Sequence, residues 1–144
     1  MPSSTGPEPV VVVDSSFLIA YHNTRDVHHA AATRAMLRLL GGEWGQALLL
    51  EYVFLEVVTV LMARRDLSAA TEVAGRLLAA REVDFVPCSD FFFETLQTFR
   101  NQPDGRLSFT DAAIVTVARR NPPGVIATFD RDFNGIPGVT VVSA

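Results

Sequence analysis

Short apolar runs alternate along the chain with longer stretches in which apolar residues recur every three to four positions. The clearest short run is VVVV at 10–13, and four consecutive β-branched residues are typical of a strand buried on both faces of a sheet. Further strands are predicted at 47–50, 83–86, 125–128 and 139–142. Helical spacing predicts helices at 17–21, 28–40, 52–64, 91–100 and 111–120, and one more that Asp66 or Ser68 caps. This alternation indicates a three-layer α/β fold, in which helices flank a central, mostly parallel sheet.

The length of 144 residues fits one domain, which we place at 10–144. The first nine residues, MPSSTGPEP, have neither an apolar run nor a positive charge, so we expect a disordered tail and no signal peptide. The longest apolar stretch, 48–63, contains two glutamates and is too short to span a membrane. Cys88 is the only cysteine, so no disulfide can form within the chain. We therefore expect a cytoplasmic protein without a membrane segment.

The net charge of −4 at pH 7 does not by itself indicate a nucleic-acid partner. All twelve basic residues are arginines, and a compositional bias of the genome explains the absence of lysine more simply than function does. Arginine matches phosphate oxygens with a rigid pair of donors, so a phosphate-bearing partner is still possible where arginines gather. Arg131 is the best placed of them, because it lies between Asp130 and Asp132.

Acidic residues follow two of the predicted strands. Asp14 comes directly after the valine run, and Asp130 and Asp132 follow the strand at 125–128. In a parallel sheet, ligands bind outside the carboxyl ends of the strands. These three side chains are therefore candidates for a shared site.

Two further acids lie on predicted helices. Asp111 begins the helix at 111–120, whose apolar face places it at the edge of the core. Glu56 is the only charged residue in YVFLEVVTVLMA, a helix so apolar that we expect it to be buried all round. A lone buried carboxylate costs several kcal/mol unless it is paired, so Glu56 requires a partner. Glu51 competes for this role, but it falls at the polar start of the helix, where an acid needs no special explanation.

Each acid taken alone has an ordinary explanation, as a helix-start residue or as an acid of a turn or loop. Brought together without a cation, they would repel one another by roughly 4 kcal/mol for a close pair. A shared site for a hard divalent cation, Mg²⁺ or Mn²⁺, explains all of them at once. Competing α/β families lack their motifs here: there is no GxGxxG, no GxxxxGKS/T and no lysine. Ser16 stands where a phosphatase of the haloacid-dehalogenase type has its second aspartate.

Four segments resemble, in their order and spacing, the motifs of PIN-domain ribonucleases: VVVVDSSFLIA, the Glu56 helix, LSFTDAAIVTVA and TFDRDF. The resemblance runs from Val10 to the C-terminus, and the compact size is most similar to the VapC toxins of toxin–antitoxin pairs. It implies an Mg²⁺- or Mn²⁺-dependent endoribonuclease that cleaves RNA phosphodiester bonds with metal-activated water. It also implies a homodimer and inhibition by a co-expressed VapB-like antitoxin.

The resemblance assigns the site residues position by position. The catalytic, metal-binding acids would be Asp14, Glu56, Asp111 and Asp130, with Asp132 as a further metal-binding acid. Asp132 would assist Asp130 or substitute for it, and the choice between one ion and two stays open. The supporting hydroxyls would be Ser16, Thr110 and Thr128. Thr110 is also predicted to cap its helix, and Arg131 is the expected contact to an RNA phosphate.

Other features have more than one interpretation. HNTRDVHH holds His22, His28 and His29, but no cysteine lies near, so we expect a solvated loop rather than a zinc site. FFF at 91–93 is expected to pack, with an interaction surface as the second interpretation. The alternative to an enzyme is a catalytically silent PIN-like module that binds a partner protein. A phosphatase of small molecules is a third hypothesis.

Overall fold

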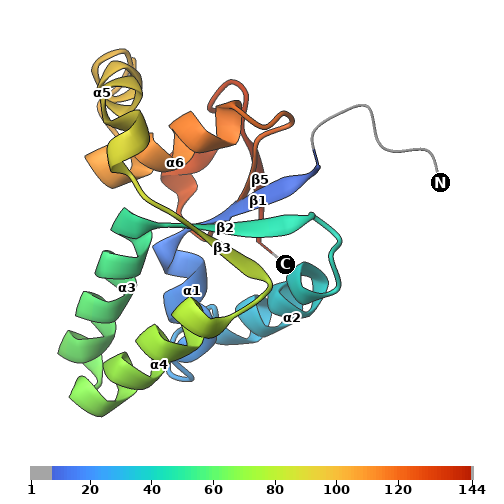
Figure 1. The fold of residues 1–144 in the computed structure, drawn as a ribbon, viewed down its shortest axis with the longest axis vertical. Coiled ribbons are helices and arrows are strands. Elements are labelled where there is room, and N and C mark those ends of the chain that lie inside the picture. The colour runs from blue at the N-terminus through green and yellow to red at the C-terminus, as the bar shows by residue number, and fades with distance from the viewer. Residues whose placement is uncertain (1–7, 144) are drawn as a thin grey trace.

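The computed structural model describes residues 8–143 and contains each of the five predicted strands. In chain order the elements are β1 (Val10–Val13), α1 (Ser15–His22), α2 (His29–Leu40), β2 (Gln46–Leu50), α3 (Glu51–Arg64), α4 (Leu67–Ala79), β3 (Val83–Val86), the short 3-10 helix η1 (Ser89–Phe91), α5 (Phe92–Arg100), α6 (Phe109–Arg119), β4 (Val125–Ala127), the short 3-10 helix η2 (Arg131–Phe133) and β5 (Thr140–Val142). Figure 1 shows that they form the predicted three-layer α/β fold.

β1 lies at the centre of the sheet, whose strand order is β3-β2-β1-β4-β5. All strand pairings among residues 8–143 are parallel, which confirms the predicted type of sheet. Val11 pairs with Ala47 of β2 on one side and with Val125 of β4 on the other. Val11 and Val12 are fully buried. This central position explains the uninterrupted valine run, because a strand covered on both faces has no polar side.

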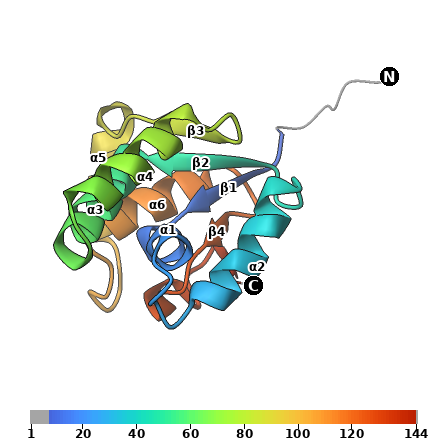
Figure 2. The ribbon, with the colours of Figure 1, turned by 90° about the horizontal axis from the view of Figure 1, so that it is seen from below.

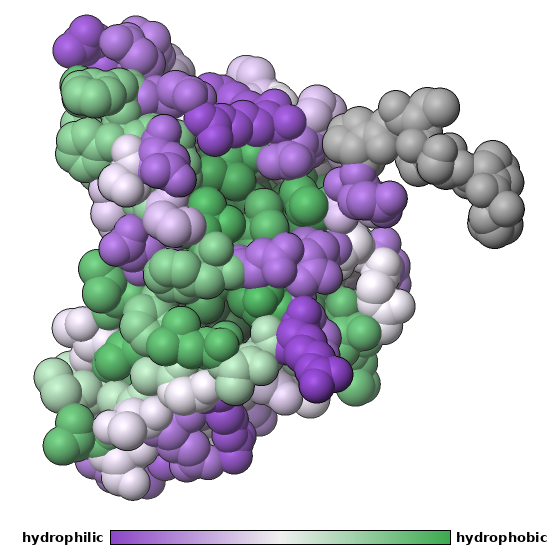
Figure 3. All heavy atoms as spheres, in the orientation of Figure 1, coloured by the Kyte–Doolittle hydropathy of each residue, from purple (hydrophilic) through white to green (hydrophobic). Residues whose placement is uncertain are grey.

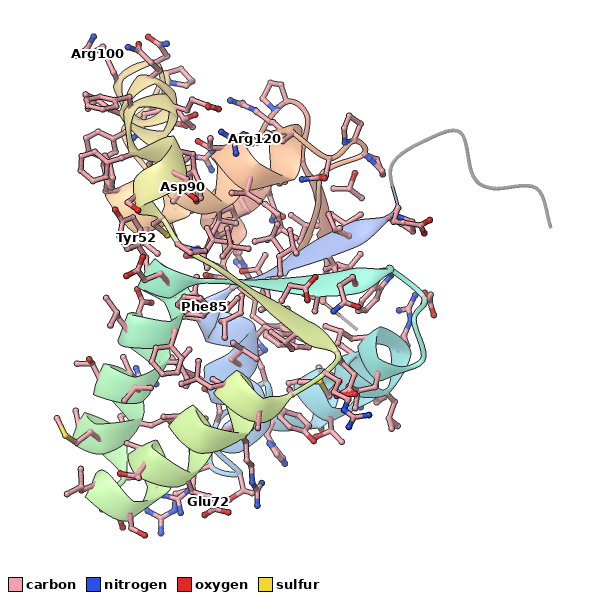
Figure 4. The ribbon with its side chains drawn as sticks, viewed as in Figure 1. Tyr52, Glu72, Phe85, Asp90, Arg100 and Arg120 are labelled. Atoms are coloured by element: carbon pink, nitrogen blue, oxygen red, sulfur yellow. The ribbon has the colours of Figure 1, made fainter. Side chains whose placement is uncertain are left out.

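The helices form two layers, one on each face of the sheet. α1, α2, α3 and α4 lie on one side, and α5 and α6 lie together on the other (Figure 1). Figure 2, seen from below, has the first of these layers nearer the viewer. Arg120, just after α6, links α6 to α5: its guanidinium pairs with Glu94 and lies 5.3 Å from the ring centre of Phe91 (Figure 4).

α3 is buried along one stripe only, contrary to the prediction from its composition. Val53, Val57 and Leu61, spaced four residues apart, are buried. Leu55 and Met62, on other faces of the helix, are 55% and 51% exposed. Glu56 is exposed as well, so the prediction of a lone buried carboxylate is wrong. The apolar sequence does not enforce burial, because α3 packs against β2, α1 and α4 and leaves its remaining surface open.

α6 begins two residues earlier than predicted, at Phe109, because Ser108 caps it. Ser108 Oγ accepts a hydrogen bond from Asp111 N at 3.1 Å, and Asp111 Oδ2 accepts one from Ser108 N at 3.1 Å. This reciprocal pair is a capping box. Thr110 lies inside the first turn, so its prediction as the cap is wrong.

The chain joins the sheet just before β1. Residues 1–7 of the predicted tail lie outside the described residues, but the Pro9 carbonyl accepts a hydrogen bond from Gln46 N at 3.1 Å. Cys88 is buried and carries a free thiol. Between residues 8 and 143, no helix has both the length and the apolarity needed to cross a membrane.

The close approach of the segments before β4 and β5 depends on Gly124, and we predict that Gly124→Ala lowers the free energy of unfolding by about 3 kcal/mol. Gly124 has a φ of +74°, and a Cβ there would lie 2.0 Å from the Gly138 carbonyl oxygen. Its own carbonyl accepts a hydrogen bond from Thr140 N at 2.8 Å, so the segments cannot separate without loss of that bond. Denaturant unfolding at equilibrium measures the change.

Gly135→Ala is the matched control for this prediction. Gly135 has a similar φ of +77°, but a Cβ there would meet no atom within 4 Å. Its replacement adds backbone strain without a collision, so we expect a loss of about 1 kcal/mol. Equal losses in the two variants would contradict the role assigned to the Gly138 carbonyl.

Candidate functional site

Four of the predicted acids line a single cleft at the carboxyl end of the central strand. They come from the end of β1, the exposed side of α3, the first turn of α6 and the segment after β4, and they are Asp14, Glu56, Asp111 and Asp130. The cleft has a volume of about 290 Å³. It lies beyond the carboxyl end of β1, between the start of α1, the second half of α3 and the first turn of α6. Its other lining residues are Ser15, Ser16, Ile19, Asp26, His28, Val60, Arg64 and Phe129.

Asp14 is the buried member of this set, with 3% of its surface exposed. Thr128 Oγ1 donates a hydrogen bond to Asp14 Oδ2 at 2.7 Å, and Ser16 Oγ donates to the same oxygen at 2.8 Å. Burial raises the pKa of Asp14 above its ordinary value of 3.8, and these hydroxyl groups act in the opposite direction. The charge of Asp130 raises the pKa further. The carboxylate is therefore fixed in orientation, while its negative charge is only partly compensated.

The same two hydroxyls also hold the backbone after β4. Ser16 Oγ accepts a hydrogen bond from Phe129 N at 3.0 Å, and Thr128 Oγ1 accepts one from Asp130 N at 2.9 Å. Ser16 and Thr128 thus lie where the sequence predicts hydroxyls that orient the site. Thr110 is placed differently: it does not line the acid cleft, but borders a separate shallow depression with Tyr52, Leu55 and Glu56.

Ser15 is a site residue that sequence reasoning missed. Its Oγ donates to Glu56 Oε1 at 2.5 Å and lies 3.4 Å from Asp14 Oδ1, so it bridges the buried acid and the exposed one. The only signal in the sequence was its position next to Asp14. Glu51, the competitor of Glu56, lies outside the cleft and accepts a hydrogen bond from Cys88 N at 3.0 Å. The geometry therefore favours Glu56 as the site acid on α3.

Asp111 is partly buried, lines the cleft and completes the capping box of α6. Partial burial raises its pKa from 3.8 to about 6, and the charges of Asp14 and Asp130 contribute in the same direction. The hydrogen bonds with Ser108 lower the pKa and offset part of this rise. The mutual influence of the three aspartates means that they lie close enough to repel one another.

Of the two acids after β4, only Asp130 lies in the cleft. Asp130 lines the cleft, and its Oδ1 accepts a hydrogen bond from Asp132 N at 2.9 Å, whereas Asp132 is not among the lining residues. Arg131 is exposed and does not line the cleft either. Arg64, at the last position of α3, does line it. Arg64 is therefore better placed than Arg131 for a ligand held in the cleft.

The donor set fits a hard divalent cation. It consists of carboxylates, and burial and neighbouring acids raise the pKa of Asp14 and of Asp111. Within residues 8–143, however, no three His, Cys, Asp or Glu side chains are gathered tightly enough to form a ready group of metal ligands. The acids thus line one cleft without closing on a common point. Their roles as metal ligands remain predictions.

The three histidines of HNTRDVHH have different surroundings. His29 Nδ1 lies 2.8 Å from the Ala20 carbonyl oxygen, and His22 packs edge-on against Tyr21 with ring centres 4.9 Å apart. His28 stacks on Phe129 beside the acid cleft. Residues 23–28 form the predicted loop between α1 and α2. His28 is exposed, and His22 and His29 at the ends of the two helices are partly buried.

The sequence and the fold of this chain are similar to those of known proteins. The model of a protein family described as PIN domain matches residues 11–139. Curated protein sequences give no match. The crystal structure of Mycobacterium tuberculosis VapC20, a sarcin–ricin loop cleaving toxin, is similar with a TM-score of 0.75 and 24% identity over 90% of this chain and 98% of that chain.

Two structures of toxin–antitoxin systems are also similar. A toxin–antitoxin complex from Klebsiella pneumoniae has a TM-score of 0.63 and 19% identity, over 92% of this chain and 96% of that chain. VapBC2 from Rickettsia felis, bound to a DNA fragment from the promoter, has a TM-score of 0.63 and 10% identity, over 92% of this chain and 97% of that chain. At these identities the likeness concerns the fold.

The raised pKa of Asp111 makes the stability of the metal-free protein depend on pH. Because the folded-state pKa of about 6 lies above the ordinary value of 3.8, the folded protein binds the proton more tightly than the unfolded chain. This contribution to stability is complete below about pH 4 and is lost as the pH rises through about 6. We predict that Asp111→Asn gains about 1 kcal/mol over wild type between pH 4 and 7.5, a value reduced for solvent screening of this partly exposed group.

Denaturant unfolding in EDTA at both pH values measures this difference. Asparagine keeps an oxygen that can accept the hydrogen bond from Ser108 N, so the helix cap is retained. Asp84→Asn, on the exposed face of the edge strand β3, is the control and should show no such gain. A constant difference between Asp111→Asn and wild type across this pH range would contradict the assigned repulsion.

Proposed function

The chain belongs to the PIN-domain family, and from this membership we propose that it is a divalent-metal-dependent endoribonuclease, the toxin of a VapBC-type toxin–antitoxin pair. The observation that carries the proposal is the convergence of Asp14, Glu56, Asp111 and Asp130 on one cleft. RNA is the proposed substrate, and the sarcin–ricin loop cleaved by VapC20 is a candidate.

The four acids would hold Mg²⁺ or Mn²⁺ in the cleft. When bound, such an ion supplies a water of lowered pKa and neutralises charge on a phosphodiester. The chain's own contribution is positioning. Thr128 and Ser16 fix Asp14, and Ser15 joins Asp14 to Glu56 across the cleft.

Arg64 is the proposed phosphate contact. It lines the same cleft as the acids, and arginine matches phosphate oxygens with its paired donors. The net charge of −4 does not prevent RNA binding, because a metal ion and Arg64 would offset the acids where the phosphate lies.

We further propose a protein partner resembling an antitoxin, and a homodimer. Large apolar side chains remain exposed on α3, α5 and β3, among them Leu55, Phe92, Phe93 and Phe85. Figure 3 shows apolar residues gathered over the face that carries α3, α4 and β3, and Figure 4 labels Phe85 there. Exposed apolar patches are typical of interaction surfaces. The same surfaces support the second candidate function, a catalytically silent binding module.

One assay separates the enzyme from the binding module. Purified protein is incubated with structured RNAs, including a sarcin–ricin loop oligonucleotide, in Mg²⁺, Mn²⁺ or EDTA. We predict cleavage only with metal, and at least about 100-fold slower cleavage by Asp14→Asn and Glu56→Gln, since both remove a carboxylate of the cleft. Glu51→Gln is the matched control from the same helix, and it should cleave as wild type does.

Each result that differs from this expectation would contradict a different part of the proposal. Cleavage that persists in EDTA would exclude the metal site, and equal losses in Glu51→Gln and Glu56→Gln would exclude the assignment of Glu56. Metal-independent binding of a partner protein, with no cleavage of any RNA, would favour the silent module. Hydrolysis of simple phosphate esters with no effect on RNA would favour a phosphatase.

A second experiment tests the phosphate contact. In the Glu56→Gln background, we predict that Arg64→Gln weakens binding of a single-stranded oligoribonucleotide about fivefold and reduces the salt dependence of its Kd by about one ion. Arg131→Gln is the matched control, since Arg131 lies outside the cleft. Fluorescence anisotropy over a range of KCl concentrations measures both quantities. A larger effect of Arg131→Gln would reverse the assignment.

A further inference from the structure

We propose that His28 and Phe129 form a nucleobase-stacking site on the rim of the acid cleft, which takes an unpaired base of the RNA beside the phosphate that is cut. The proposal rests on the proposed function and adds to it a recognition site for a base. The two residues are far apart in the chain and meet only in the fold.

Three rings form a column that runs from the core to the solvent. Phe17 is fully buried, Phe129 is partly buried and His28 is exposed. The rings of Phe17 and Phe129 stack with centres 6.2 Å apart and planes 15° apart. The rings of Phe129 and His28 stack more closely, with centres 4.6 Å apart and planes only 5° apart. The exposed imidazole is thus backed by a support anchored in the core.

The column is attached to the site through the backbone. Phe129 lies between Thr128, which donates to Asp14, and Asp130, which lines the cleft. Phe129 N donates to Ser16 Oγ at 3.0 Å, so the hydroxyl that orients Asp14 also fixes the middle of the column. His28 and Phe129 both line the acid cleft. A ring stacked on His28 would therefore lie next to the acids.

The local structure gives no other reason for an imidazole at this position. His28 is the cap residue of α2, yet its side chain makes no capping hydrogen bond. The turn before the helix is held instead by Asp26 Oδ1, which accepts from His28 N at 2.9 Å. Within residues 8–143, the His28 ring nitrogens have no hydrogen-bond partner, and the ring contacts Phe129 alone among the aromatic rings.

The chemistry of this surface suits a base better than a phosphate or an aliphatic group. An exposed ring with a rigid ring behind it presents a flat face, and every nucleobase has a π-face that stacks on such a platform. The free ring nitrogens can bond to the edge or the sugar of the same nucleotide. Arg64 in the same cleft would take the phosphate, so one nucleotide would meet both groups.

Binding measured without cleavage tests the site. In the Glu56→Gln background, single-stranded hexaribonucleotides with one 2-aminopurine at each position in turn are titrated with His28, His28→Phe and His28→Leu proteins in Mg²⁺. We expect His28→Leu to bind about tenfold more weakly, which is within the range for one stacked base, and to lose the quenching of 2-aminopurine at one position. His28→Phe should retain both.

In His28→Leu, the leucine side chain still covers Phe129. Weaker RNA binding by this variant would therefore not result from exposure of the Phe129 ring. Val27→Ala is the control for the loop, because Val27 is 89% exposed and adjacent to His28. It should bind as the parent protein does. Equal binding and quenching by His28 and His28→Leu would overturn the proposal, and so would a His28→Phe variant as weak as His28→Leu.

The failure of this site and the failure of the proposed function are distinguishable. Metal-dependent RNA cleavage with no effect of His28→Leu on binding or quenching would overturn the stacking site alone. RNA binding that depends on an aromatic ring at position 28, with no cleavage by the wild-type protein, would retain the base site and overturn the nuclease.

Discussion

The burial of one carboxylate, that of Asp14, sets the geometry of the whole site. Removal of a carboxylate from water costs several kcal/mol unless hydrogen bonds replace the lost solvation. Thr128 and Ser16 supply two of these bonds, and Asp14 N donates to the Ala127 carbonyl at 3.0 Å. Because these partners belong to α1 and to the end of β4, the bonds that make the burial possible also fix both elements against β1. The cleft follows from this arrangement.

The remaining repulsion among the acids is not relieved within the fold. Each ion pair found in residues 8–143 lies on the exposed surface and involves none of the cleft acids. Burial and neighbouring acids leave the pKa of Asp14 and of Asp111 raised. A cation that binds the folded protein and not the unfolded chain recovers this energy as stability. The fold is thus built with unpaired negative charge, and relief of this cost would favour the proposed binding of a metal ion.

The sequence predicts the sheet well and the site less completely, for physical reasons. The valine run and the alternating pattern depend on local composition, so β1 and the order of elements could be predicted. One argument for Glu56 was wrong, because composition indicated burial whereas packing leaves the side chain exposed. Glu56 nevertheless lines the cleft, and its role there stays a prediction. The sequence could not single out Ser15 and Arg64 as residues of the cleft, because their distances to the acids depend on how α1 and α3 pack. The sequence also failed to show that Ser108 rather than Thr110 caps α6, because this depends on the backbone geometry at the start of the helix.

The two walls of the cleft differ in how firmly they are held. One wall consists of Asp14, Ser16, Thr128 and the backbone of Phe129, which hydrogen bonds join around a buried centre. On the other wall, Glu56 and Arg64 are exposed side chains on α3, and Glu56 is bonded to the first wall through Ser15. This difference accounts for acids that share a cleft without forming a ready group of metal ligands. In the proposed function, Glu56 would turn from Ser15 toward a cation held by Asp14, and Arg64 would contact the phosphate. The firm wall also carries the ring column, because Phe129 lies directly between Thr128 and Asp130. The proposed metal site and the proposed base site would therefore share this hydrogen-bonded wall. The exposed side chains of α3 would adjust to the ligand that is bound there.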